Sequence, residues 1–215
     1  MHQPEKHQRA HRPGSRYPPD WDGLIQIALP VALLAIAALP AHAQWTLDGE
    51  DSAVSFVSTK AINVAEVHRF GTLSGGVNDE GQVNVSISLA SVDTGIELRD
   101  DRMRGMLFDT DNYSAATVSA KVDTAAIGAM SPGESSDMVI EGNLDLHGES
   151  RPLTMDVVVT RSGDNRLLVV SKKPIVVNAP EFNLGEGVEA LRAIAGLPSI
   201  GLAVPVSFVL AFDQG

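Results

Sequence analysis

Apolar and polar residues alternate along most of the chain after residue 44. In the segment 82–91 the apolar positions are Val83, Val85, Ile87 and Leu89, and one polar residue separates each from the next. Successive side chains of a β-strand point to opposite faces, so this spacing predicts a strand with one buried and one exposed face. A chain built of such segments buries its apolar faces by closing a sheet on itself or by stacking two sheets, which indicates a barrel or a sandwich.

Seven further segments have the same alternating character and are bounded by Gly, Pro, Asn or Ser. They are residues 53–59, 68–77, 117–123, 138–148, 152–160, 166–171 and 204–212. The predicted fold is therefore all-β, with about eight antiparallel strands. We expect the linker 148–152 to join two of these strands as a hairpin.

Helical spacing occurs in only two places, residues 98–107 and residues 186–198. Their apolar residues are Met103, Met106 and Leu107 in the first segment, and Val188, Leu191 and Ile194 in the second. Apolar residues three and four positions apart share one face of a helix. The sequence therefore predicts one or two short helices in a chain that is otherwise strands.

The N-terminal segment has the features of an export signal. Residues 24–39 are apolar, and Ala41-His42-Ala43 then supplies the small residues at which a signal peptidase cuts. The apolar run is interrupted by Pro30 and is shorter than the ~20 residues of a membrane-spanning helix. Cleavage is therefore favoured over retention as an anchor, and the mature chain is expected to begin near Gln44.

These boundaries predict a leader of residues 1–43 and a single domain of residues 44–215 in the periplasm. Asp20 and Asp22 directly precede the apolar run, where such signals usually carry positive charge. The true translation start is therefore left open.

Composition then excludes several classes of protein. No cysteine occurs in the sequence, which excludes disulfides, thiol chemistry and a lipoprotein anchor. The predicted mature chain has 12 basic and 24 acidic residues, a net charge of about −12. This charge repels phosphate backbones, so we expect no nucleic-acid partner.

The residues that usually carry metal or catalytic chemistry lack the spacing that such chemistry needs. His68 and His147 are the two histidines after residue 43, and they form neither H-x-H nor H-E-x-x-H. We expect His147 to be a solvated residue on the polar face of its strand and His68 to lie in the wall of the core or of a cavity. The acidic run 109–112 lacks the Gly and Glu of a calcium-binding EF-hand loop. No catalytic residue, no metal and no obligatory cofactor is therefore predicted.

Two runs of residues carry a resemblance to a known family. The first is S-x-D-T-G…R-D-x-x-M, formed by Ser91, Asp93, Thr94, Gly95, Arg99, Asp100 and Met103. The second is G-x-L-x-L-x-G-x-x-R-P-L, residues 142–153. With the segments around them, from Trp45 to Phe212, they resemble the YceI-like family of periplasmic polyisoprenoid-binding proteins. The resemblance implies a lipocalin-like barrel whose elongated apolar cavity holds a long isoprenoid, such as a quinone or polyprenyl tail.

This resemblance gives a role to the charged run around residues 97–108. A short helix that closes one end of a barrel decides how its cavity is entered. We expect Met103, Met106, Leu107 and Phe108 to form the apolar underside of such a cap. The residues predicted to anchor it are Asp93, Arg99, Asp100 and Asp101. The full set of predicted ligand-binding residues is Phe56, Phe70, Val85, Ile87, Met103, Met106, Leu107, Phe108, Ile140, Leu144, Met155 and Val157. The alternative, that the apolar residues of the cap fill a dry core, stays open at this stage.

Two other functions remain alternatives. An outer-membrane barrel would also be exported and alternating, but the predicted mature chain has eight aromatic residues, too few for two interfacial girdles. An enzyme or a stress-related factor acting on a bound lipid would use the Arg99 and Asp100 region, whose mixed charges are also typical of a helix surface. The sequence leaves open which lipid is bound, whether a membrane supplies it, and whether two copies pair as a homodimer.

Overall fold

The computed structural model describes residues 43–215, which form one antiparallel sheet of eleven strands. The strands are β1 Ala43–Lys60, β2 Val64–Phe70, β3 Leu73–Asn78, β4 Gln82–Ser88, β5 Val92–Asp93, β6 Ala115–Lys121, β7 Ser135–Leu146, β8 Glu149–Gly163, β9 Arg166–Ser171, β10 Ile175–Asn178 and β11 Ala203–Gln214. The helical segments are η1 Leu89–Ser91, α1 Glu97–Arg102, η2 Met103–Leu107, α2 Thr124–Gly128, η3 Ala179–Phe182 and α3 Gly185–Ile194. The predicted leader lies outside the described residues apart from Ala43, so its removal stays a prediction.

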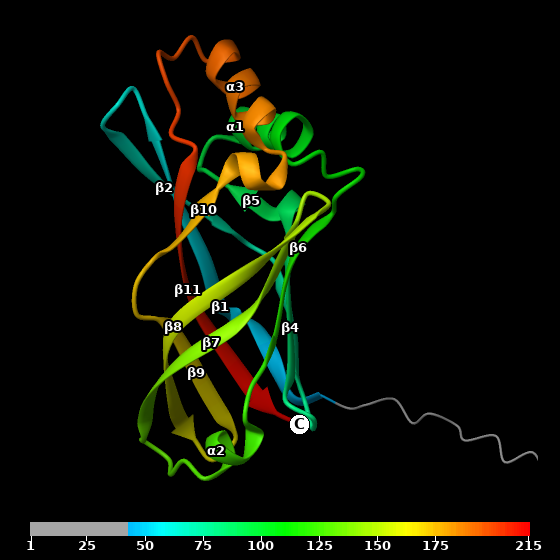
Figure 1. Ribbon diagram of the computed structural model, residues 1–215, viewed down its shortest axis with the longest axis vertical. Helices are drawn as coiled ribbons and strands as arrows, with labels where there is room; N and C mark the ends of the chain where they lie inside the picture. Colours follow the sequence, from blue (N-terminus) through cyan, green and yellow to red (C-terminus); the bar gives the residue numbers. More distant parts are fainter. Residues whose placement is uncertain (1–42) are drawn as a thin grey trace, which may run out of the picture. The chain divides into compact units, whose positions relative to one another are not determined.

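Eight of these strands close into a barrel. Their order around it is β1, β3, β4, β6, β7, β8, β9 and β11, and β11 pairs back with β1 (Figure 1). The alternation of the sequence explains the closure, because Val85 and Ile87 of β4 are buried while Ser86 between them is partly exposed. The predicted all-β, eight-stranded antiparallel barrel with short helices is confirmed.

The barrel closes between two strands that are far apart in the chain. Trp45 near the start of β1 pairs with Gln214 at the end of β11. The ladder continues to Phe56, which pairs with Val206. Both strands are long. Besides pairing with each other, each pairs with two further strands, β1 with β3 and β2, and β11 with β9 and β10.

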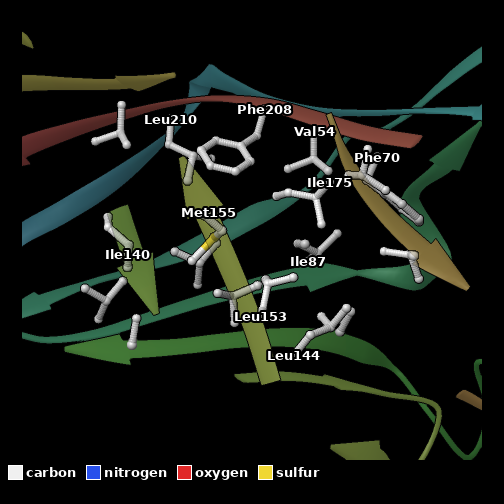
Figure 2. A pocket seen from close by; sticks show the side chains of 18 of the residues that line it. Val54, Phe70, Ile87, Ile140, Leu144, Leu153, Met155, Ile175, Phe208 and Leu210 are labelled. Atoms are coloured by element: carbon white, nitrogen blue, oxygen red, sulfur yellow. The ribbon is translucent and has the colours of Figure 1, made fainter. Parts of the chain in front are cut away.

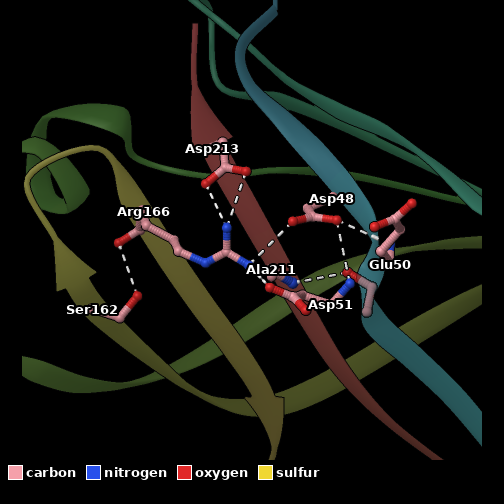
Figure 3. Close-up of polar contacts among 8 residues, drawn as sticks. Asp48, Glu50, Asp51, Ser162, Arg166, Ala211 and Asp213 are labelled. Atoms are coloured by element: carbon pink, nitrogen blue, oxygen red, sulfur yellow. Dashed lines mark hydrogen bonds and ion pairs between the residues drawn. The ribbon is translucent and has the colours of Figure 1, made fainter.

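Arg166 on β9 lies across this closure (Figure 3). Its guanidinium donates to Asp213 on β11 at 2.9 Å and to Asp48 on β1 at 3.2 Å, and it also pairs with Asp51. The register of β1 against β11 shifts between Asp48 and Ala53, so the acidic residues lie at an irregularity of the strand. One side chain thus joins three strands where the sheet closes.

The barrel wall is built differently toward one end. There the second half of β1 pairs with β2 instead of β3, and the first half of β11 pairs with β10 instead of β9. β8 pairs with β9 only from Val157 onward, so β7 is the strand partner of residues 149–156. The short strands β5 and β10, which the sequence analysis did not predict, complete this end of the sheet.

The helices lie at the two ends of the barrel (Figure 1). α2 stands at one end, after β6, and α1, η2, η3 and α3 gather at the other. We define the cap as residues 97–108, which comprise α1, η2 and Phe108. α3 packs on η2, so this helix is in direct contact with the cap.

The hairpin of β7 and β8 turns earlier than the sequence analysis predicted. Leu146 pairs with Glu149, so its loop is residues 147–148 and not 148–152. His147 and Gly148 both have positive φ, 50° and 81°, as a two-residue hairpin turn of type I′ requires. His147 is consequently in the turn and half-buried, with its ring centroid 4.3 Å from that of Tyr113. The prediction of a solvated residue on a strand face was wrong.

Candidate ligand cavity and its cap

A cavity of about 240 Å³ lies inside the barrel, and every residue of its wall is apolar. All eight barrel strands contribute side chains, and both ends add residues from helices. Figure 2 shows Phe70, Ile87, Leu144 and Phe208 pointing into the same space from different strands. Period-two alternation produces this wall, because the residues between these positions face outward.

The cavity extends along most of the barrel. Its wall includes every second residue from Val83 to Ile87 along β4, a distance of roughly 13 Å at about 3.3 Å per strand residue, and continues with Leu89 of η1. Ile127 of α2 belongs to one end of the wall and Val188 of α3 to the other. A cavity that is long for so small a volume fits a slender chain better than a compact ring system.

The structure places ten of the twelve predicted ligand-binding residues in this wall. They are Phe56, Phe70, Val85, Ile87, Leu107, Phe108, Ile140, Leu144, Met155 and Val157. Their contact with a ligand stays a prediction, since position in the wall is a necessary condition for contact and not a demonstration of it.

Met103 and Met106 lie elsewhere. Met103 is buried in the core but is not part of the cavity wall, and Met106 is 40% exposed. The reason is the local helix type: residues 103–107 form a π-helix in which Phe108 N donates to Met103 O. The wider turn breaks the i, i+3, i+4 relation of an α-helix, so the predicted position of Met106 on the underside of the cap was wrong.

A chain of hydrogen bonds fixes the start of the cap. Arg99 donates from Nε to Thr94 Oγ1 at 2.8 Å and from its NH2 nitrogen to Thr94 O at 2.7 Å. The Thr94 hydroxyl in turn donates to Asp100, which also accepts from Thr94 N at 2.9 Å. Asp100 is buried and its Oδ1 accepts both of these bonds, so the D-T-G…R-D motif is a structural clasp between the approach to α1 and α1 itself.

The carboxylate partner of Arg99 is Glu66 on β2, at 2.7 Å from its NH1 nitrogen. Of the three acids that the sequence analysis expected to anchor the cap, Asp100 lies in the clasp, whereas Asp93 and Asp101 pair with arginines other than Arg99. Asp93 binds Arg69, and Asp101 binds Arg104 within the cap. Glu66 could not be found from the sequence because it is 33 residues away, on a strand that reaches the cap only in the folded chain.

Hydrogen bonds with Lys60 and Arg99 lower the pKa of Glu66 below its ordinary value, so Glu66 is ionised at neutral pH. Backbone donation from Gly95 and the side chain of Arg69 lower the pKa of Asp93 in the same way. Glu66 and Asp93 are therefore charged and paired.

His68 lies directly behind the cavity wall. It is 4% exposed, and its ring centroid is 5.2 Å from that of Phe56. Its Nε2 is hydrogen-bonded to Ser58 Oγ at 2.8 Å. Burial lowers the pKa of His68 below its ordinary value, and the nearby charge of Arg99 acts in the same direction.

Within residues 43–215, no cluster of three His, Cys, Asp or Glu side chains is arranged to hold a metal ion. Among the helices of this part of the chain, none is long and apolar enough to cross a membrane.

The model of the YceI-like domain matches residues 45–212, which is most of the chain. The chain belongs to the YceI-like family. Comparison with curated proteins gave no match.

Solved structures agree with this YceI-like assignment. A polyisoprenoid-binding domain from Saccharophagus degradans, implicated in plant cell wall breakdown, is 38% identical with a TM-score of 0.80. That match covers 81% of this chain and 100% of the other. BcnA from Burkholderia cenocepacia is 24% identical with a TM-score of 0.60, over 77% of this chain and 98% of its own, and shows that the fold is shared.

Several wall residues of this YceI-like barrel were not among the predicted site residues. Phe208 and Phe212 share the inward face of β11, and the alternation of residues 204–212 could have identified them. Val188 stands on the predicted helix 186–198, but nothing in the sequence indicated that this helix reaches the cavity. Ile127 lies on the five-residue helix α2, which is too short to leave a periodic signal.

Proposed function

We propose that this protein is a periplasmic carrier that holds a long isoprenoid or similar lipid, such as a quinone or polyprenyl tail, in its barrel cavity. One observation carries the proposal: the cavity is wholly apolar and runs along the barrel from α2 to α3. The polyisoprenoid-binding domain from Saccharophagus degradans supports the ligand class, because it shares 38% of its residues with this chain. The location rests on the predicted removal of residues 1–43.

The energetics favour reversible loading from a membrane. Each CH₂ group left in water is unfavourable by about 0.8 kcal/mol, so a free tail would not persist in solution. A bilayer and an apolar cavity are both apolar surroundings, so transfer between them is close to neutral. The membrane is therefore the proposed source and destination of the lipid.

The proposed role is binding without catalysis. Arg99 and Asp100, the residues that an enzyme of this fold would have used, are engaged with Thr94 and Glu66 in the clasp of the cap. An enzyme acting on the bound lipid would require chemical turnover of the extracted ligand that is lost on changing Arg99 or Asp100.

The direct test is mass spectrometry of an organic extract of the purified protein, with uptake of a prenylated quinone from vesicles as a second measurement. Val118 and Thr117 are neighbours on β6, and only Val118 belongs to the cavity wall. Val118→Trp should fill the cavity and lower lipid occupancy several-fold, whereas Thr117→Trp places the same ring outside and should leave occupancy unchanged. A protein that yields no lipid and takes none from vesicles has a dry core, and the proposal then fails. Light scattering of the same samples would show whether two copies pair.

A further inference from the structure

The inner face of β1 and β2 changes from apolar to polar within one pair of residues. Val54 pairs with Phe70, and both side chains line the cavity. The next inward pair along the two strands is Phe56 and His68, and the pair after that is Ser58 and Glu66. On the inner face of β1 and β2, the apolar wall of the cavity is therefore followed, toward the cap, by a layer of polar side chains.

An aromatic group separates the cavity from this layer. The ring centroids of Phe56 and Phe70 are 5.3 Å apart, and those of Phe70 and Phe108 are 5.9 Å apart. All three rings belong to the cavity wall. His68 lies beside Phe56 and is not itself part of the wall, so contact between a ligand and His68 would require an aromatic ring to move.

Nearly every polar group in the layer already has a partner. The three guanidinium nitrogens of Arg99 bind Thr94 and Glu66, and Lys60 binds Glu66 at 2.8 Å. His68 differs, because Nε2 is bound to Ser58 but Nδ1 is buried with no hydrogen-bond partner among residues 43–215. A buried polar atom without a partner is unfavourable, so such an atom at the end of a cavity points to a missing partner.

We infer that His68 Nδ1 is the recognition point for the polar head of the ligand, and that this head is a neutral carbonyl or hydroxyl group rather than a phosphate. This inference rests on the proposed function and adds an orientation to it: the head lies under the cap and the tail points toward α2. Nδ1 donates to a carbonyl when Ser58 donates to Nε2, and accepts from a hydroxyl when the tautomer is reversed. A phosphate would need a cation to pair with, and Arg99 and Lys60 are both occupied by Glu66. The lowered pKa of His68, caused first by its burial, keeps the ring neutral and agrees with a neutral partner.

The test uses three probes with the same tail: geranyl-1,4-benzoquinone, geranylbenzene and geranyl diphosphate. Wild-type protein should bind the quinone about three- to tenfold more tightly than geranylbenzene, which lacks oxygen, as one hydrogen bond predicts. Geranyl diphosphate should show no such gain. His68→Phe should abolish the preference for the quinone, and His68→Gln, whose amide can donate, should retain part of it. Thr117→Val, a change on β6 outside the cavity wall, should leave the preference intact.

A second measurement does not depend on any variant. The ¹⁵N resonance of His68 Nδ1 should shift when the quinone is added and stay in place when geranylbenzene is added. Equal affinity for these two probes, or an Nδ1 resonance that the quinone does not move, would overturn the inference while leaving lipid binding intact. Tighter binding of the diphosphate than of the quinone would also overturn it. If none of the probes binds, the proposed function fails as well, so the two failures are distinguishable.

Discussion

Arg99 on α1 and Glu66 on β2 form an ion pair with an N–O distance of 2.7 Å. Lys60 at the end of β1 binds the same carboxylate at 2.8 Å. The cap is thus tied to the pair of strands that borders the aromatic end of the cavity. We expect entry of a ligand at this end to disturb that contact.

Replacing Arg99 should loosen the cap without unfolding the barrel. Arg99→Met removes three hydrogen bonds and leaves the carboxylate of Glu66 with Lys60, so the free energy of unfolding should fall by about 1–2 kcal/mol. Exchange of bound lipid with vesicles should become faster, because local opening of the cap then no longer requires the ion pair between Arg99 and Glu66 to break. Arg102→Met is the matched control on the same helix and should change neither quantity. Unaltered exchange in the Arg99 variant would show that lipid does not pass the cap.

The geometry of the cap predicts different effects of substitution at Met106 and at Phe108, two positions apart. Phe108→Asp places a charge in the cavity wall and should strongly reduce co-purified lipid. Met106→Asp changes an exposed side chain and should leave both lipid occupancy and melting temperature close to wild type. Mass spectrometry and thermal melts of the two variants check this, and equal loss of lipid in both would mean that Met106 does reach the ligand.

The inward and outward faces of the strands should respond very differently to charge. Ile87→Asp and Met155→Asp bury an unpaired carboxylate and should destabilise the barrel by several kcal/mol. Ser86→Asp lies on the opposite face of β4 from Ile87 and should remain within about 0.5 kcal/mol of wild type. Denaturant titrations of the three variants measure these differences. Similar midpoints for Ile87→Asp and Ser86→Asp would contradict the face assignment.

Gly187 lies where α3 approaches the cap most closely among the glycines of this helix. A Cβ atom there would lie 2.8 Å from Met106 O and 2.9 Å from Leu107 Cα, so Gly187→Ala should push the two helical segments apart. We expect a loss of about 1–3 kcal/mol in stability and a faster exchange of lipid. At Gly185 the same substitution meets no atom closer than 3.7 Å and should be close to neutral. Calorimetry of both variants decides the matter, and equal melting temperatures would mean that α3 does not press on the cap.

Stability should decrease on mild acidification because of His68. Its pKa is lower in the folded state than the ordinary 6.5, so the unfolded chain binds the proton more readily. The stabilisation from the neutral ring is present above pH 6.5 and is lost as the pH falls from there through the folded pKa. Burial is the main cause, Arg99 and Lys60 add to it, and Glu66 and Asp100 oppose it.

The corresponding measurement is the melting temperature between pH 8 and pH 5. His68→Gln should flatten this profile, and His147→Gln controls for the loss of an imidazole elsewhere. A wild-type profile that His68→Gln does not alter would show that His68 does not titrate on unfolding.

The alternation of the sequence predicted the barrel and most of its wall, because strand periodicity assigns each residue to a face without reference to distant contacts. Val85, Ile87, Met155 and Val157 could be placed inside on that basis alone. Met106 could not, because the difference between an α-turn and a π-turn depends on the packing of α3 against the cap.

Contacts between residues that are far apart in the chain could not be predicted from the sequence either. Glu66 and Arg99 are brought together by the tertiary fold, and so are Arg166 and its three acidic partners. The proposed role of His68 likewise depends on the tertiary fold. Its type and position were visible, but the burial of Nδ1 without a partner appears only when β1, β2 and the cap are assembled.

The pairing of β1 with β11 has a consequence for how the chain folds. The ladder from Trp45 to Phe56 finds its partner about 150–170 positions further on, so the barrel cannot close until β11 has been synthesised. Contacts between such distant segments form slowly, because the intervening loop must lose conformational entropy before the strand pairing contributes favourable free energy. A nascent chain that still lacks β11 keeps two open sheet edges and an exposed apolar face. The open edges and the apolar face both favour aggregation until the final strand arrives.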